Sequence, residues 1–235
     1  DIIATYPSVI YKVYLKNGTK LSIDNPVHLP DPSLIEKIEE PIIKASIMIP
    51  NIYIGEVMNL VLSKRGECTS TESIDAGHVI ITAHLPFHEI LIEFHDKLKS
   101  STKGYGSMDY EHFEYKEDNM VKLDILVHGE VVDAFSCIVH RDCAAARGRQ
   151  LVERLKKVIP PQMFQVPLQA AIGGKVIARE TVKQLRKNVI AKCYGGDISR
   201  KRKLLEKQKE GKKKMKQVGK VNIPQEAFVE ILKSE

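Results

Sequence analysis

The sequence predicts an α+β protein of two domains, and three observations predict it. The chain has 235 residues, enough for two domains with separate cores, and its 43% hydrophobic and 28% charged residues are typical of a globular protein. Runs of period two, typical of strands, alternate with runs at helical spacing. The segment from Lys175 to Lys220 carries 17 Lys/Arg against 4 Asp/Glu, a balance of +13 in a chain whose total is +6.

Residues 1–39 predict the end of a preceding α+β domain followed by a linker. An alternating strand over residues 9–15 turns at Asn17-Gly18 into a second strand over residues 20–23. Prolines then mark a connector, and residues 33–38 have helical spacing. Because one hairpin has no partner elements of its own, we expect most of that domain to lie before residue 1.

Residues 40–118 predict a ferredoxin-like domain. Pro50 ends the first strand, Gly66 suits the end of the first helix, and Asp75-Ala76-Gly77 joins the middle strands. The order β-α-β-β-α-β in one short segment is the split βαβ unit. The predicted elements are strands at 42–49, 67–74, 78–85 and 105–115, and helices at 53–61 and 87–98.

Residues 119–235 predict a second α+β domain with a basic helical tail. Asp142 is a plausible N-cap for its first helix, and Pro160-Pro161 ends that helix. Few apolar side chains support the charged tail, so we expect residues 195–235 to be mobile at least in part. The predicted elements are strands at 121–127, 131–140, 165–172 and 175–178, and helices at 144–158 and 200–217.

The apolar phase of these elements predicts two cores. The side chains expected in the first core are Met48, Val57, Val61, Ile80, Ile90 and Phe94. Those expected in the second core are Leu123, Ile125, Phe135, Leu151, Leu155 and Ile172.

The basic segment 175–220 predicts a polyanionic partner. So dense a positive field repels itself unless a polyanion neutralises it. The stretch from Val182 to Lys216 contains a single aromatic residue, Tyr194, and no Trp, Phe or Pro, so it favours contacts to phosphates over reading of bases. The alternative is a solvated, partly helical charged tail.

No motif in the chain indicates catalysis or a resident metal. His140-Arg141-Asp142 resembles a kinase catalytic loop, but Arg147 stands where that loop needs Asn. Cys137, His140 and Cys143 lack the fourth ligand of a structural zinc site. A GxxxxGK[ST] phosphate loop is absent from the sequence. We therefore expect no catalytic residue, metal or cofactor in this chain.

Cysteine usage and hydropathy bear on the compartment. The four cysteines are scattered without disulfide-framework spacing, which favours a reducing cytosol. No apolar run approaches the roughly 18 to 20 residues of a membrane span.

Several blocks of the chain carry a family resemblance. They are EPI (40–42), LSKRGE (62–67), LKSSTKGYGSMDY (98–110), HRD (140–142), ARGRQLVERLKKVIP (146–160) and the long block 177–228. Together they resemble the C-terminal half of the LepA family of translational GTPases, also called elongation factor 4 or back-translocase. The resemblance runs along essentially all 235 residues. It implies that 40–118 is the domain shared with elongation factor G and that 119–235 is the LepA-type C-terminal domain.

The resemblance also implies partners and an activity. The family acts on elongating ribosomes, so it implies contact with large-subunit rRNA and tRNA, a cytoplasmic monomer, and a role in back-translocation or fidelity of protein synthesis under stress. GTP, Mg²⁺ and GTP hydrolysis are implied for a domain that this chain lacks. The alternative is a basic assembly module, or one that binds peripherally to an anionic membrane. The expected RNA contacts are Lys64, Arg65, Lys183, Arg186, Lys187, Lys192, Arg200, Lys201, Arg202, Lys203, Lys207, Lys209, Lys212, Lys213 and Lys214.

Overall fold

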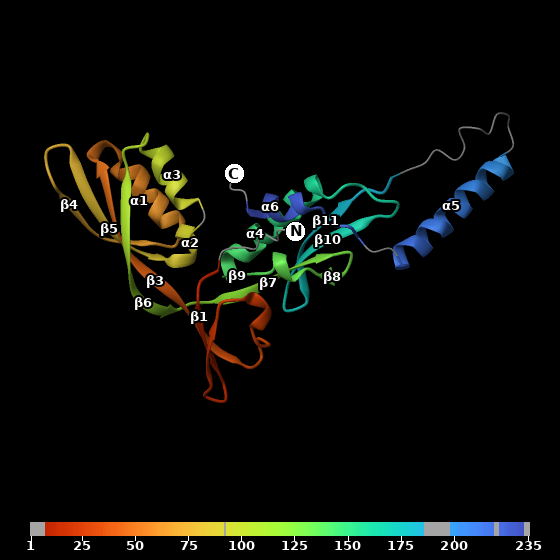
Figure 1. The fold of residues 1–235 in the computed structure, drawn as a ribbon, viewed down its shortest axis with the longest axis horizontal. Coiled ribbons are helices and arrows are strands. Elements are labelled where there is room, and N and C mark those ends of the chain that lie inside the picture. Colours follow the sequence, from red (N-terminus) through yellow and green to blue (C-terminus); the bar gives the residue numbers. More distant parts are fainter. Residues whose placement is uncertain (1–7, 92, 186–197, 219–220, 233–235) are drawn as a thin grey trace. The chain divides into compact units, whose positions relative to one another are not determined.

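The computed structural model describes residues 8–91, 93–185, 198–218 and 221–232. It forms two compact units, one over Pro7–Met120 and one built mainly from Val121–Lys233, each with its own hydrophobic core (Figure 1). Both units combine helices with strands, which confirms the predicted α+β class. No helix of the described residues is long and apolar enough to cross a membrane.

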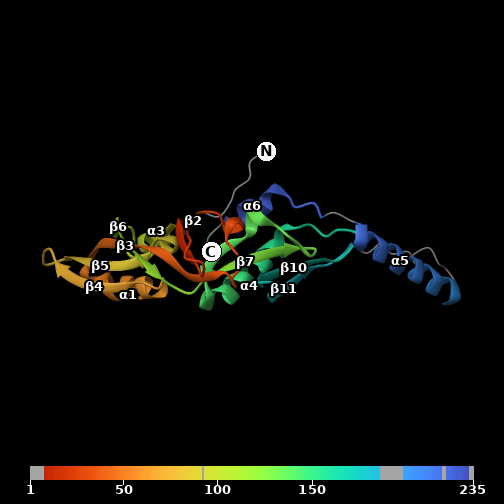
Figure 2. The same cartoon turned by 90° about the horizontal axis from the view of Figure 1, so that it is seen from below.

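The first unit has the predicted split βαβ order from its third strand onward. Strands β6, β3, β5 and β4 lie side by side and are all antiparallel (Figure 2). The three helices lie on one side of this sheet (Figure 1). The elements are β1 (Tyr11–Leu15), β2 (Lys20–Ile23), β3 (Ile35–Pro50), α1 (Ile54–Ser63), β4 (Glu67–Ser73), β5 (His78–Pro86), α2 (Phe87–Leu91), α3 (Phe94–Ser101) and β6 (Ser107–Glu117).

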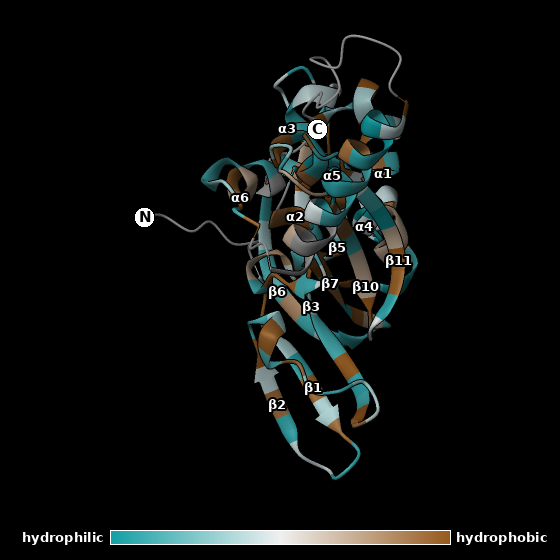
Figure 3. Ribbon diagram, turned by 90° about the vertical axis from the view of Figure 1, so that its right-hand side faces the viewer, coloured by the Kyte–Doolittle hydropathy of each residue, from teal (hydrophilic) through white to brown (hydrophobic). Residues whose placement is uncertain are grey.

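The N-terminal hairpin belongs to the same sheet. β1 pairs with β2, as predicted, but it also pairs with the start of β3, so the hairpin does have a partner. Glu39 lies opposite Lys12 of β1 and opposite Glu117 of β6, so β3 runs without a break through residues 39 and 40. The helix predicted at 33–38 is wrong. Strand pairing outweighs the helical spacing there, and hydrophobic and hydrophilic bands alternate along β1 and β3 (Figure 3).

Two helices of the first unit differ from their predictions. The single helix expected at 87–98 is divided into α2 and α3, with Glu93 in the left-handed region at φ 67°. At the end of α1 the left-handed residue is Arg65, at φ 58°, and not Gly66. Gly66 is required for another reason: a Cβ there would lie 2.6 Å from a methyl carbon of Leu85.

The first core confirms four of its six predicted members. Val57, Val61, Ile90 and Phe94 are buried against β3 and β5. Met48 is instead 43% exposed and Ile80 is half-buried, because both side chains lie on the side of the sheet that the helices do not cover. Lys44 and Ser46 stand in the same phase of β3 as Met48, and this polar phase is the exposed one.

The second unit places one helix on a five-stranded sheet. The sheet order is β11-β10-β7-β8, and β9 also pairs with β7. The strand predicted at 131–140 is divided by a 3₁₀ turn at Asp133–Phe135. The elements are β7 (Met120–Val127), β8 (Glu130–Val131), β9 (Cys137–His140), α4 (Arg141–Val158), β10 (Val166–Ile172), β11 (Lys175–Val182), α5 (Ile198–Val218) and α6 (Gln225–Leu232).

Helix α4 packs closely on this sheet. It begins at Arg141, and its N-cap is His140, whose Nδ1 accepts from the Asp142 backbone N–H, so the prediction of Asp142 as the cap is wrong. Gly148 allows the close approach, since a Cβ there would lie 2.9 Å from the Cβ of Ala170. Leu151 and Leu155 of the same helix are buried, as predicted.

The chain after α5 returns to this core, which the sequence did not predict. Ala227 of α6 is fully buried, and the rings of Phe228 and Phe135 lie 4.8 Å apart. The expectation that residues 195–235 are mobile at least in part stays a prediction: α6 packs against the core, whereas residues 195–197, 219–220 and 233–235 lie outside the described residues. Of the second core, Leu123, Ile125 and Phe135 are also buried, and Ile172 is partly buried.

Candidate nucleic-acid interface

Helix α5 concentrates positive charge in 21 residues. It carries ten Lys/Arg and two Glu, a balance of +8. Its own carboxylates therefore cannot neutralise most of its cations. The ion pair between Arg202 and Glu206 spans 3.9 Å on adjacent turns, and both side chains are strongly exposed, at 82% and 69%. An exposed pair of this kind contributes only about 0.3–0.5 kcal/mol.

The cations of α5 point in every direction around the helix axis. Residues of an α-helix follow each other at about 100° intervals, so the run Arg200–Lys203 alone spans about 300° of the circumference. Lys207 and Lys209 are exposed, and Lys212 is half-exposed. Lys213 and Lys214 lie on the same helix. A helix that is basic all round suits contact with phosphates on more than one side.

The remaining predicted contacts lie before α5. Lys183 is exposed and directly follows β11. Arg186, Lys187 and Lys192 fall within residues 186–197, outside the described residues.

Strand β11, which precedes Lys183 and α5, is linked to helix α4 by an ion pair. Lys156 Nζ of α4 lies 2.7 Å from Glu180 Oε2 of β11, and this hydrogen bond holds the pKa of Glu180 below its ordinary value. Val182, the last residue of β11, is buried in the second core. The basic segment thus leaves from a strand that is fixed in the fold.

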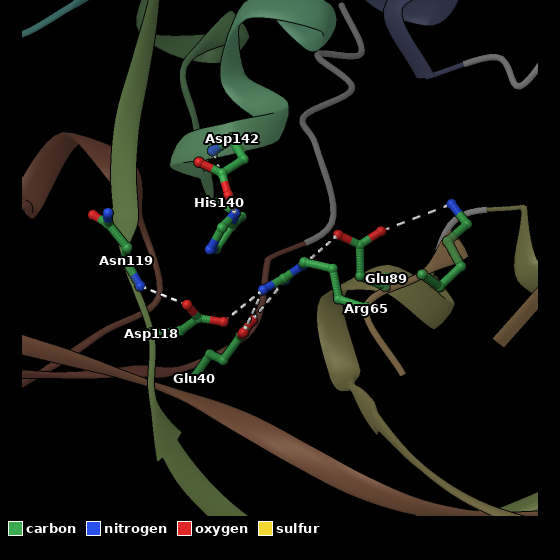
Figure 4. A network of polar contacts seen from close by, with 8 residues as sticks. Glu40, Arg65, Glu89, Asp118, Asn119, His140 and Asp142 are labelled. Atoms are coloured by element: carbon green, nitrogen blue, oxygen red, sulfur yellow. Dashed lines mark hydrogen bonds and ion pairs between the residues drawn. The ribbon is translucent and has the colours of Figure 1, made fainter. Parts of the chain in front are cut away.

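Lys64 and Arg65 have a different environment from the other predicted RNA contacts. The guanidinium of Arg65 forms a two-pronged pair with Glu40, at 2.7 and 3.1 Å, and also contacts Asp118 at 2.9 Å and Glu89 at 3.4 Å (Figure 4). Lys64 Nζ lies 3.8 Å from Glu89. Both cationic side chains are only 19% exposed. The structure thus gives them carboxylate partners within their own unit.

The backbone positions Arg65 for this network. After α1, the N–H of Arg65 donates to the carbonyl of Leu62 and the N–H of Gly66 donates to that of Val61, the bond pattern that closes a helix around one left-handed residue. Glycine usually occupies that left-handed position, because a side chain there costs roughly 1 kcal/mol. Arg65 adopts this conformation at that cost, and its guanidinium contacts the carboxylates of the network.

Burial shapes the proton affinities of the network. Burial raises the pKa of Glu40, whose side chain is 1% exposed, and the Arg65 guanidinium opposes that rise. For Arg65, burial favours the neutral form, but the hydrogen bond and charge of Glu40, with the charges of Glu89 and Asp118, hold its pKa above the ordinary value. Glu40 and Arg65 therefore stabilise each other as a buried ion pair.

Sequence reasoning missed this network because its members are far apart in the chain. Glu40 and Asp118 lie 25 and 53 residues from Arg65. The only local sign is a bulky residue at the end of α1, directly before Gly66, where glycine would be expected.

The described part of the chain holds no group of three or more His, Cys, Asp or Glu placed to bind a metal ion. Its cysteines Cys68, Cys137 and Cys143 are free, and burial raises the pKa of Cys137 to about 12.

Two family models match this chain in succession. A model described as "Elongation factor G C-terminus" matches residues 37–126, and one described as "GTP-binding protein LepA C-terminus" matches residues 127–233. Fold and matches together define a pair of C-terminal domains of translation elongation factors.

Similar curated proteins give a closer assignment. Proteins named elongation factor 4 are 61% identical in Anoxybacillus flavithermus, 58% in Protochlamydia amoebophila and 58% in Bacillus subtilis, over 100% of this chain in each case. The chain therefore belongs to the LepA, or elongation factor 4, family. It spans 39%, 39% and 38% of the length of these relatives. A crystal structure of a Thermus thermophilus protein aligns with 34% of this chain and 12% of that chain, at 26% identity and a TM-score of 0.33, too little overlap to compare folds.

Proposed function

We propose that this chain is the ribosome- and tRNA-binding C-terminal part of a GTP-hydrolysing translation factor that acts on elongating ribosomes, in back-translocation or fidelity under stress. The observation that carries the proposal is helix α5, which keeps a balance of +8 after its own two carboxylates are counted. Ribosomal RNA and tRNA supply the phosphates that would do so. Family membership supplies the translational context.

The proposed RNA surface consists of the basic segment after β11. Lys183 and the cations of α5 belong to it, together with Arg186, Lys187 and Lys192 on sequence grounds. Lys64 and Arg65 are left out, because their charges are met by Glu40, Glu89 and Asp118. GTP and Mg²⁺ would bind to another part of the longer protein, which would work as a monomer in the cytoplasm.

Co-sedimentation tests this proposal. The chain is pelleted with salt-washed bacterial 70S ribosomes and, at the same salt concentration, with phosphatidylglycerol vesicles. We expect pelleting with ribosomes, little with vesicles, and a clear loss of ribosome binding in the triple variant Lys201→Gln, Arg202→Gln, Lys203→Gln.

Preferential pelleting with vesicles would replace the proposal with a membrane-peripheral module. The α5 helix exposes Ile198, Leu205 and Met215 as its apolar contribution to such binding, without Trp or Phe. Equal ribosome pelleting by the triple variant and the unchanged chain would contradict the RNA surface itself.

A further inference from the structure

Strands β3–β6 form four of the six strands in the sheet of the first unit, and their helices lie on one side. Among the described residues of this unit, no helix covers the other side. Cross-strand partners point to the same side of a sheet, and neighbours along a strand point to opposite sides. Ile43 and Ile47 of β3 point into the core beneath the helices. Lys44, Ser46 and Met48 therefore point away from it. We call their side of β3–β6, with their cross-strand partners on β4, β5 and β6, the open sheet face.

Three rows of side chains cross this open sheet face. The last row joins Met48 to Ile80 of β5, and the middle row joins Ser46 to Thr82. In the first row His84 lies opposite Lys44. The side chains at the centre of the face are therefore either small and polar or apolar. Met48 is 43% exposed although it is a large hydrophobic residue.

The two outer strands make the rim acidic. β4 contributes Glu67 and Glu72, and β6 contributes Asp109 and Glu111. All four are exposed, and Lys44, which pairs with Glu111 at 3.4 Å, is the positively charged residue in the three rows. A centre that is mainly small or apolar inside a polar, charged rim is the usual anatomy of a protein–protein interface.

This charge pattern excludes the ligand that such sheets often bind. Four-stranded sheets of this order that bind RNA do so by stacking bases on exposed aromatic rings beside basic residues. Here the rings of His84 and Phe113 stack on each other, 4.2 Å apart and 17° from parallel. Glu67, a carboxylate, lies opposite His84. Four carboxylates against one lysine repel a phosphate backbone.

We propose that the open sheet face docks a basic protein surface. Lys and Arg of the partner would pair with the acidic rim, and its apolar side chains would cover Met48 and Phe113. Where the chain acts on the ribosome, as proposed above, the partner is a basic protein exposed among the RNA. The first unit would then bind protein while α5 binds RNA. This inference rests on the proposed function only for the location of the partner.

Two matched charge reversals test the inference with 70S ribosomes as the probe. The face variant is Glu72→Lys with Asp109→Lys. The control is Glu56→Lys with Asp96→Lys, two exposed positions on the helices α1 and α3 of the same unit. Both variants raise the net charge by the same amount, so general attraction to RNA strengthens equally. We expect the face variant to bind ribosomes about tenfold more weakly and the control at least as tightly as the unchanged chain.

Site-specific photocrosslinking identifies what covers the face. A benzophenone amino acid replaces Thr82 at its centre or, as a reference, Lys209 of α5. We expect Thr82 to crosslink to ribosomal protein and Lys209 to crosslink to RNA. Crosslinks from Thr82 to RNA, to a second copy of the chain, or to nothing would overturn the inference, as would equal binding of the two charge-reversal variants. If the sheet-face inference fails but Lys209 crosslinks to RNA, the proposed function still stands. If Lys209 gives no RNA crosslinks and the chain does not pellet with ribosomes, the inference and the proposed function both fail.

Discussion

The two units of this chain use positive charge in opposite ways. Residues 7–120 carry 11 Lys/Arg and 17 Asp/Glu, and residues 121–233 carry 25 and 11. In the first unit Arg65 is surrounded by three carboxylates and is 19% exposed. In the second, α5 has ten cations and two carboxylates. A basic residue thus indicates a binding surface only where the fold leaves its charge unmatched.

Removing Arg65 gives the largest expected effect. In Arg65→Met the buried Glu40 loses its counter-charge, which costs about 3–5 kcal/mol of the unfolding free energy of the first unit. Amide exchange at Ile47, a fully buried residue of β3, measures that free energy. The control Arg202→Met, at an 82% exposed position of α5, should change stability by less than about 0.5 kcal/mol. A similar small change in Arg65→Met would contradict the buried network.

A cavity in the second core should lower the unfolding free energy of that unit alone. Leu155 of α4 is 1% exposed, so Leu155→Ala should cost about 2–5 kcal/mol. The loss should appear in amide exchange at Ile125 and not at Ile47, because the units have separate cores. Leu205→Ala on α5, where the leucine is 47% exposed, is the control with little expected effect. Equal losses at Ile125 and Ile47 would mean that the units unfold together.

The cost of losing Arg65 should depend on pH. The folded pKa of Glu40 lies above its ordinary value of 4.5 because of burial, so the folded state holds more protons than the unfolded chain. The stability that this proton contributes is present below pH 4.5 and is lost as pH rises through the folded pKa.

Loss of Arg65 raises that pKa further, because the guanidinium favours the carboxylate. The destabilisation in Arg65→Met should therefore shrink as the pH falls from 7 towards 5. It should stay constant with pH when Glu40→Gln is also present. A pH-independent loss in the single variant would show that Glu40 is not the group left unpaired.

The smallest expected effect concerns the helical propensity of α5. Gly211 lies inside this helix with open space around it, so Gly211→Ala should stabilise the helix by about 1 kcal/mol. We expect more helical circular dichroism in the free chain and a smaller gain on adding tRNA. The control Gly55→Ala in α1 should leave the dichroism unchanged, because α1 is fixed by Val57 and Val61 in the first core. An equal gain for both variants would contradict this view of α5.

Local patterns were sufficient to predict most of the architecture. The split βαβ order, the Asn17-Gly18 hairpin and the helix that ends before Pro160 follow from periodicity and turn residues. The errors occur where a segment far away in the sequence determines the local structure or the burial of a residue. Residues 35–38 form a strand because β1 pairs with them, and Met48 is exposed because the helices cover the other face.

Of the candidate site, the run of cations was predictable from the sequence and the neutralisation of Arg65 was not. A run of cations such as Arg200–Lys203 is visible in the sequence whatever the fold does with it. The neutralisation of Arg65 depends on Glu40, Glu89 and Asp118, which only the folded chain brings together. Helix α6 was missed because its burial depends on Phe135, far away in the sequence.

The most direct test of this contrast is the salt dependence of tRNA binding. Fluorescence anisotropy would give the slope of log affinity against log salt concentration for the unchanged chain and two triple variants. One variant neutralises Lys201, Arg202 and Lys203 of α5 to Gln. The other neutralises Lys99, Lys103 and Lys116 to Gln, three exposed lysines of the acidic first unit.

Each phosphate contact contributes about 0.7–0.9 to that slope, so the α5 variant should flatten it by roughly 2–3. The first-unit variant should leave the slope unchanged. Equal slopes for the α5 variant and the unchanged chain, or equal flattening by both variants, would contradict the account.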